Sequence, residues 1–187
     1  MKKLLFSLPL IALTTLGAQA QGYLLFANVT QDLSVEKRIS DLYTGDYLTS
    51  DYQAQLFVGP NGSLASVLAA VDVPVLFLDS PPESQGDFLG NELAINGYNP
   101  GDTITLEVRV WPTIYATWEQ GYAAALNNSN IHVGRSGVFN LVLGSNGAGT
   151  EMAPSMPLFV VEIVPEPSSV ALGALGLATM FLRRRKA

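Results

Sequence analysis

Cysteine is absent from this 187-residue sequence, and histidine occurs once, as His132. The lack of cysteine excludes thiol catalysis, cysteine-based zinc sites and any disulfide framework. Ser136 follows His132 by four residues, but an extended or looped backbone does not force the two side chains together. A serine nucleophile also needs an orienting acid and an oxyanion hole, and neither is visible in the sequence. We therefore predict that the protein is not an enzyme.

Positive charge is scarce away from the ends of the chain. Residues 21–164 hold four cations and fifteen acids, a net charge of −11, whereas the two ends hold the other six cations. A domain this acidic is repelled by phosphate backbones, which excludes nucleic-acid binding. The length of this segment fits one domain with its own core. No pair of its acids stands out by spacing, so a secreted glycan hydrolase is the least favoured alternative.

The first twenty residues have the pattern of a secretory signal peptide. Met1-Lys2-Lys3 gives a charged start, and Leu4–Leu16 an apolar stretch. Ala18 and Ala20 supply the small residues of a cleavage site, so we predict that signal peptidase cuts after Ala20. An uncleaved N-terminal anchor is the alternative.

Residues 165–187 combine a stiff turn, an apolar run and a cationic end. Pro165 and Pro167 restrict the backbone on both sides of Glu166. As a helix, the uncharged run Val170–Leu182 spans about 20 Å, which is short against roughly 30 Å of hydrocarbon. The cations after it favour the cytoplasmic side, and they are Arg183, Arg184, Arg185 and Lys186. We predict a membrane helix at 170–182; a permanent anchor and a helix docked on the domain are the alternatives.

This tail resembles the PEP-CTERM sorting domain of Gram-negative bacteria in its Pro165-Glu166-Pro167 motif, its Gly/Ala/Leu-rich run and its terminal cations. The resemblance implies recognition by exosortase, a membrane-embedded protease that cleaves near the Pro-Glu-Pro. It also implies a host that makes exopolysaccharide. The opening Gly22–Asn28 and the strand and turn at Tyr52–Pro60 resemble PEP-CTERM proteins with a β domain of unknown function.

Between the two signals, apolar and polar residues alternate with the period of two that is typical of strands. In Thr103–Trp111 the even-numbered residues are apolar, and the odd-numbered ones include Glu107 and Arg109. This indicates a half-buried strand with a surface ion pair of little energetic value. Further strands are predicted at Tyr23–Val29, Tyr52–Val58, Val73–Leu78, Phe88–Ile95, Val138–Leu143 and Leu158–Val164, with Leu64–Val71 either strand or helix. The pattern predicts an all-β fold for residues 21–164, a single antiparallel β-sandwich of jelly-roll or Ig-like type.

One short helix is predicted at Trp118–Leu126. Thr117 and Gln120 fit a capping box at its start, although Gly121 is unfavourable inside a helix. Four aromatic residues within twelve positions are candidate glycan contacts, because exposed rings stack on sugar faces: Trp111, Tyr115, Trp118 and Tyr122. The alternative is that these rings pin the helix to the sheet and cover its edge.

Three aspartates flank tyrosines and a glycine in one polar region, and these are Asp41, Asp46 and Asp51. Clustered oxygen ligands of this kind suit calcium, although the spacing is not that of an EF-hand and a solvated loop is the alternative. The sequence predicts no other cofactor.

Together these features predict an exported, non-enzymatic protein of the cell surface or exopolysaccharide matrix. It would cross the inner membrane, stay anchored before processing, and then reach the surface or the matrix. Its expected partners are signal peptidase, exosortase and the membrane, with exopolysaccharide as a candidate ligand. A carbohydrate-binding module is the main alternative.

Overall fold

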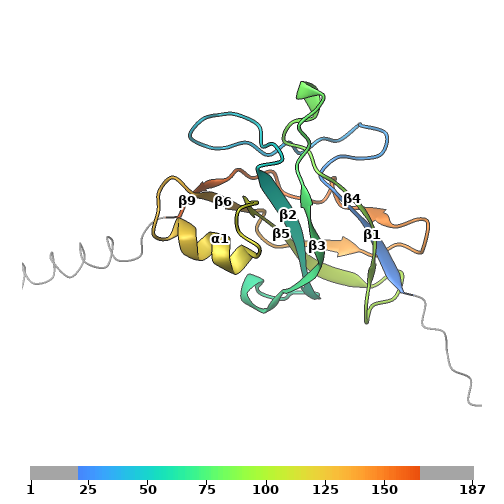
Figure 1. Ribbon diagram of the computed structural model, residues 1–187. Helices are drawn as coiled ribbons and strands as arrows, with labels where there is room; N and C mark the ends of the chain where they lie inside the picture. The colour runs from blue at the N-terminus through green and yellow to red at the C-terminus, as the bar shows by residue number, and fades with distance from the viewer. Residues whose placement is uncertain (1–20, 165–187) are drawn as a thin grey trace, which may run out of the picture.

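The computed structural model describes residues 21–164, which form two β-sheets, one α-helix and two short 3₁₀ helices (Figure 1). The predicted signal peptide and membrane helix lie outside the described residues. The smaller sheet has the order β4-β1-β8, with bounds Leu89–Ile95, Gly22–Ala27 and Thr150–Glu151. The larger sheet has the order β3-β2-β5-β6-β9, and β7 also pairs with β5. Its bounds are β2 Tyr52–Pro60, β3 Ala69–Leu76, β5 Thr103–Pro112, β6 His132–Arg135, β7 Phe139–Val142 and β9 Glu162–Ile163. The α-helix α1 is Trp118–Ala125, and the 3₁₀ helices are Ala65–Val67 and Pro82–Ser84.

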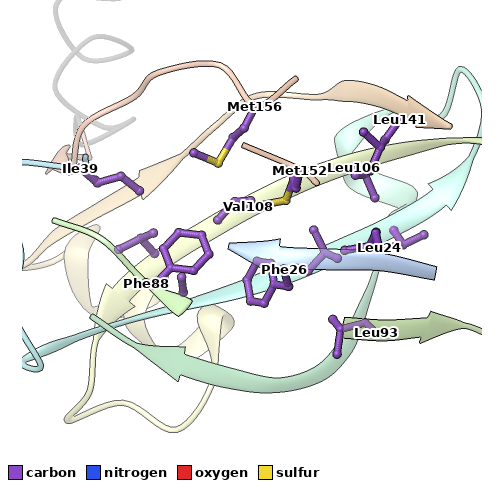
Figure 2. Close-up of a cluster of buried hydrophobic side chains, with 14 of the residues drawn as sticks. Leu24, Phe26, Ile39, Phe88, Leu93, Leu106, Val108, Leu141, Met152 and Met156 are labelled. Carbon is purple, nitrogen blue, oxygen red and sulfur yellow. The ribbon is translucent and has the colours of Figure 1, made fainter. Parts of the chain in front are cut away.

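A hydrophobic core lies between the two sheets and takes side chains from both. Leu24 and Phe26 of β1 are buried in one cluster with Leu93 of β4 and Val108 of β5 (Figure 2). The ring centroids of Phe26 and Phe88 lie 4.9 Å apart. The period-two pattern of β1 therefore produces the expected result, because alternate residues enter the core. The all-β prediction is confirmed, and the two packed sheets are consistent with a β-sandwich; its jelly-roll or Ig-like type stays a prediction.

One strand pair departs from the predicted antiparallel arrangement. The two residues of β8 run parallel to β1, with Leu24 opposite Thr150 and Leu25 opposite Glu151. A tight hairpin forces antiparallel pairing, but a long connection does not. Because β8 lies far along the chain from β1, its direction is set by how the chain returns to the sheet.

Strand β5 is buried on both faces, so the prediction of a half-buried strand is wrong. Its even-numbered side chains enter the core between the sheets. On the opposite face, Thr105, Glu107 and Trp111 are also buried. The reason is helix α1, which lies over this outer face of the larger sheet (Figure 1) and builds a second cluster there. That cluster contains Phe57, Leu68, Trp111, Trp118, Ala125 and Val133.

The predicted helix is confirmed, with its last helical residue one position earlier than expected. The Thr117 hydroxyl accepts a hydrogen bond from the backbone N–H of Gln120 at 3.4 Å, as an N-cap should. Close packing explains why glycine occupies position 121 inside the helix: a Cβ built there would lie 2.9 Å from the Trp111 Cβ. The missing side chain lets the helix lie directly against β5, which outweighs the low helix propensity of glycine.

The strands near the edges of the larger sheet fit their predictions less well. A strand or helix is expected at Leu64–Val71 and a separate strand at Val73–Leu78. The structure has a 3₁₀ helix at Ala65–Val67, followed by the single strand β3. Asp72 interrupts β3 with a φ of 58°, and the register with β2 shifts at this point. The strand predicted at Leu158–Val164 is reduced to the two residues of β9.

Candidate functional site

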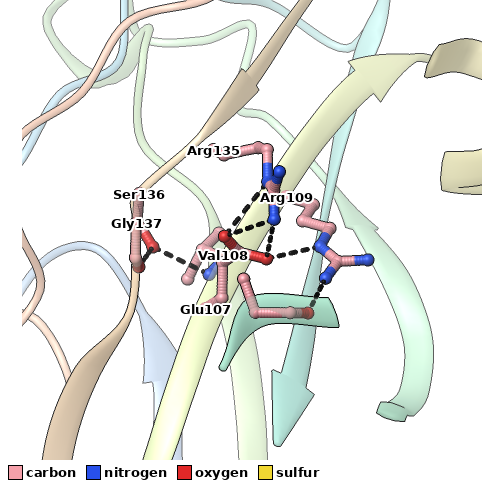
Figure 3. Close-up of polar contacts among 7 residues, drawn as sticks. Glu107, Val108, Arg109, Arg135, Ser136 and Gly137 are labelled. Carbon is pink, nitrogen blue, oxygen red and sulfur yellow. Dashed lines mark hydrogen bonds and ion pairs between the residues drawn. The ribbon is translucent and has the colours of Figure 1, made fainter. Parts of the chain in front are cut away.

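The structure separates His132 from Ser136. The Ser136 hydroxyl accepts from the Val108 N–H at 2.9 Å and donates to the Gly137 carbonyl at 2.7 Å (Figure 3). It therefore helps to hold the chain against β5. His132 lies in β6, and its Nδ1 contacts the Asp41 carboxylate.

Asp41 is a buried carboxylate with several partners. Besides His132, it accepts hydrogen bonds from the backbone N–H groups of Tyr43 and Thr44 at 2.8 and 3.2 Å. Burial opposes its ionisation, but these hydrogen bonds outweigh burial and hold the pKa of Asp41 below its usual value. Its oxygens are thus already engaged by protein donors.

The calcium hypothesis for Asp41, Asp46 and Asp51 gains no support. Within residues 21–164, no group of three or more histidine or acidic side chains is placed to hold a metal ion. Calcium takes six to eight oxygen ligands, and the three aspartates do not supply such a set.

The four candidate glycan contacts are not a row of exposed rings. Trp111 is fully buried, and its Nε1 donates to the Tyr115 carbonyl at 2.9 Å. Trp118 is 6% exposed, and its ring lies 6.1 Å from that of Trp111 and 5.3 Å from that of Tyr122. The expectation of exposed rings is therefore wrong for both tryptophans, because they pin α1 to the sheet. Tyr115 and Tyr122 remain partly exposed.

A hollow of about 500 Å³ opens beside this cluster. We call it the arginine hollow, and it is lined by Leu64, Ala65, Ser66, Arg109, Trp118, Tyr122 and Arg135. Sequence reasoning found its two aromatic residues but missed its two arginines. They belong to different strands, β5 and β6, which pair at Arg109 and Arg135.

Glu107 joins the two arginines, and it is 1% exposed. The Arg109 Nε donates to its carboxylate at 2.6 Å, and the Arg135 Nε and Nη2 donate at 3.1 and 3.0 Å (Figure 3). The prediction of a surface ion pair is therefore wrong, because α1 and the 3₁₀ helix Ala65–Val67 cover the pair. The Arg109 Nη2 also donates to the Ala65 carbonyl at 2.8 Å.

A second, larger hollow of about 730 Å³ lies on the outer face of the smaller sheet. We call it the acidic hollow. It is lined by Leu25, Ala27, Val29, Thr30, Gln31, Leu33, Glu36, Arg38, Leu78, Pro81, Glu83, Ser84, Asp87, Leu89 and Gly90. Sequence reasoning missed it, because its residues come from two stretches far apart in the chain, 25–38 and 78–90, and carry no motif.

Asp87 is the unusual side chain of the acidic hollow, since it is a carboxylate only 4% exposed. Burial and, to a smaller extent, the nearby Glu36 raise its pKa to about 6, although Arg38 opposes the shift. The Asp87 Oδ1 has no hydrogen-bond partner. A buried acceptor without a donor is uncommon in folded proteins and calls for an explanation.

The structure thus defines a β-rich domain that ends directly before the C-terminal segment. Residues 164–186 match the family model of the PEP-CTERM protein-sorting motif, which confirms the resemblance drawn from the tail. The chain carries this motif, and the motif implies export and membrane-anchored processing with exosortase as the processing partner. No curated protein and no solved structure matches the chain. No helix within the described residues 21–164 is long and apolar enough to span a membrane.

Proposed function

We propose that the protein is a non-enzymatic component of the cell surface or exopolysaccharide matrix, delivered and processed through its C-terminal signal. In this proposal, signal peptidase removes residues 1–20. The apolar run 170–182 then holds the domain at the membrane, with the four cations on the cytoplasmic side. Exosortase then cuts near Pro165-Glu166-Pro167. The observation that carries the proposal is the match of residues 164–186 to the sorting motif.

The position of the motif relative to the fold supports this processing. Strand β9 ends at Ile163, so only Val164 separates the last strand from Pro165. Val164 packs against the second cluster beneath α1. Because the two described clusters draw all their residues from 24–164, a cut near the motif leaves the sandwich whole.

The proposal predicts a specific C-terminus for the surface-located protein. Mass spectrometry of the chain from a host with exosortase should find an end near 165–167 and no Arg183–Ala187. Deleting the exosortase should leave the full tail on membrane-bound protein. Glu166→Ala should block most of the processing, whereas Glu162→Ala, an exposed acid just outside the motif, should not. An intact tail on surface-located protein in the exosortase-containing host would contradict the proposal.

Glycan binding at the arginine hollow is the second candidate function. It is supported by an aromatic ring beside charge: Tyr122 is partly exposed, and the Arg135 side chain is 41% exposed. Arg109 and Arg135 are two of only four cations in residues 21–164, and they outnumber Glu107 locally. This arrangement favours an acidic polysaccharide, with carboxylates near Arg135 and a sugar face on Tyr122.

This candidate predicts binding of the host's own acidic exopolysaccharide and of alginate, but not of neutral dextran. Tyr122→Ala should weaken the binding about fivefold, since an aromatic contact contributes roughly 1 kcal/mol. Tyr43→Ala, which removes an exposed tyrosine elsewhere, should leave it unchanged. Isothermal titration calorimetry measures both. Equal binding of alginate by the two variants would place any glycan site elsewhere.

A further inference from the structure

The acidic hollow is bounded by one face of the smaller sheet and by two loops. Its floor includes Leu25 and Ala27 of β1 and Leu89 of β4, which lie on the face of the smaller sheet opposite the core residues Leu24 and Phe26. The loops that contain Val29–Arg38 and Leu78–Asp87 rise around this floor. A backbone hydrogen bond from Leu78 N–H to the Asp87 carbonyl at 2.9 Å ties the second loop together.

Charge in this hollow is unbalanced. Glu36, Glu83 and Asp87 line it with one cation, Arg38. Arg38 lies 3.3 Å from Glu36 and 3.8 Å from Asp87, and its Nε makes no hydrogen bond to either carboxylate. The Asp87 carboxylate is therefore buried with only a distant, shared counter-charge. A buried charge in this condition is stabilised by a further cation that brings hydrogen-bond donors.

The remaining lining is mostly aliphatic, with Thr30, Gln31 and Ser84 as its uncharged polar members. Leucine, valine, alanine and proline side chains surround the carboxylate, and none of the residues that line the hollow is aromatic. Sugar stacking therefore does not suit this site, in contrast to the arginine hollow. An alkyl chain gains from contact with such a wall, at about 0.8 kcal/mol for each CH₂ that is buried.

We propose that the acidic hollow binds an alkylammonium group, with the NH₃⁺ donating to Asp87 and the alkyl chain lying against Leu25, Val29 and Leu89. An ammonium has three donors and no acceptor, so it complements an unpartnered carboxylate oxygen. The same chemistry is presented by a free aliphatic amine and by a lysine side chain. The binding is independent of the sorting signal and of glycan recognition.

The test uses the full chain in lipid nanodiscs, with Leu and Val methyl groups isotopically labelled and empty nanodiscs as the blank. The probes are n-pentylamine, pentan-1-ol of the same alkyl length, and Nα-acetyl-lysine methylamide. We expect pentylamine to shift the methyl signals of Leu25, Val29 and Leu89 in a saturable way. Pentan-1-ol should bind at least about tenfold more weakly, since it lacks the charge-assisted hydrogen bond. Binding by the lysine analogue indicates a protein lysine as the source, and binding by pentylamine alone indicates a free amine.

Asp87→Asn supplies the decisive comparison. The Asp87 Oδ1 has no hydrogen-bond partner, so the amide should not disturb the fold, yet pentylamine affinity should fall about tenfold or more. Asp72→Asn makes the same chemical change at an exposed aspartate outside the hollow and should have no effect.

A pH titration of the unmodified chain tests the same group without a mutation. The amine stays protonated, while Asp87 changes charge around pH 6 in the presence of Glu36, Arg38 and Glu83. Affinity should therefore fall roughly tenfold from pH 7 to pH 5. Equal binding of amine and alcohol, or an Asp87→Asn variant that binds pentylamine as the parent does, would overturn the proposal.

Discussion

Replacing Glu107 with alanine should lower the free energy of unfolding by about 3 to 5 kcal/mol, the range found when one partner of a buried ion pair is removed. The carboxylate is 1% exposed and accepts hydrogen bonds from both Arg109 and Arg135. Without it, two guanidinium groups face each other across a small cavity. The Arg109 side chain is only 9% exposed and cannot turn to water without leaving its place over the Phe57 ring, 3.8 Å away.

Glu107 and its partner Arg135 should not contribute equally to the free energy of unfolding. Arg135→Ala removes a side chain that is 41% exposed, so its cost should be only about 1 kcal/mol. Glu119→Ala removes an exposed glutamate on α1 and should change the free energy of unfolding by less than about 0.5 kcal/mol. Urea denaturation of the three variants measures these differences. A Glu107→Ala variant no less stable than the Glu119→Ala variant would show that the carboxylate is not buried in solution.

Glu107 also illustrates what an amino-acid pattern predicts and what it leaves open. The alternation in Thr103–Trp111 correctly predicts a strand and the face that enters the core. It cannot predict that α1 covers the other face, because that depends on where a helix docks. Two local signs point to this burial in retrospect: Trp111 lies on the polar face, and Gly121 lies inside the helix. A glycine at that place is expected where a helix approaches a large side chain closely.

The candidate sites follow the same rule. The sorting motif is contiguous in the sequence, so its residues were all identified from the sequence, and the family comparison confirms the motif. The arginine hollow combines two strands, a helix and a 3₁₀ segment, and only its aromatic residues form a visible cluster along the chain. Asp87 has no sequence signal at all. Its properties come from burial and from the nearby Glu36, which are consequences of the tertiary fold.

The second large effect is expected at Asn28, a fully buried amide that joins three stretches of backbone. Its Nδ2 donates to the Lys37 and Gly86 carbonyls at 2.9 and 2.8 Å, and its Oδ1 accepts from the Phe88 N–H at 2.7 Å. The side chain thereby holds the end of β1 to both loops that surround the acidic hollow.

We expect Asn28→Ala to lower the free energy of unfolding by about 3 to 4 kcal/mol, because a buried donor left without a partner costs roughly 1 to 3 kcal/mol and two further hydrogen bonds are lost. Asn127→Ala is the matched control: its Nδ2 also donates to a backbone carbonyl, that of Ala123 at 2.8 Å, but it is exposed. It should cost less than about 1 kcal/mol. Equal stability of the two variants would contradict the prediction.

Asn28→Asp separates the role of the donor from that of the acceptor. The introduced carboxyl keeps the side-chain volume and still accepts from the Phe88 N–H, but when ionised it sets an oxygen against the Lys37 and Gly86 carbonyls. Its pKa should therefore rise in the folded state, so the ionised form destabilises the fold at neutral pH. The penalty relative to the parent should shrink as pH falls through that raised pKa, because the protonated carboxyl donates one hydrogen bond again. A pH series of urea denaturation curves for the parent and this variant measures the difference, and a penalty that does not change with pH would show that the donor side of Asn28 contributes little.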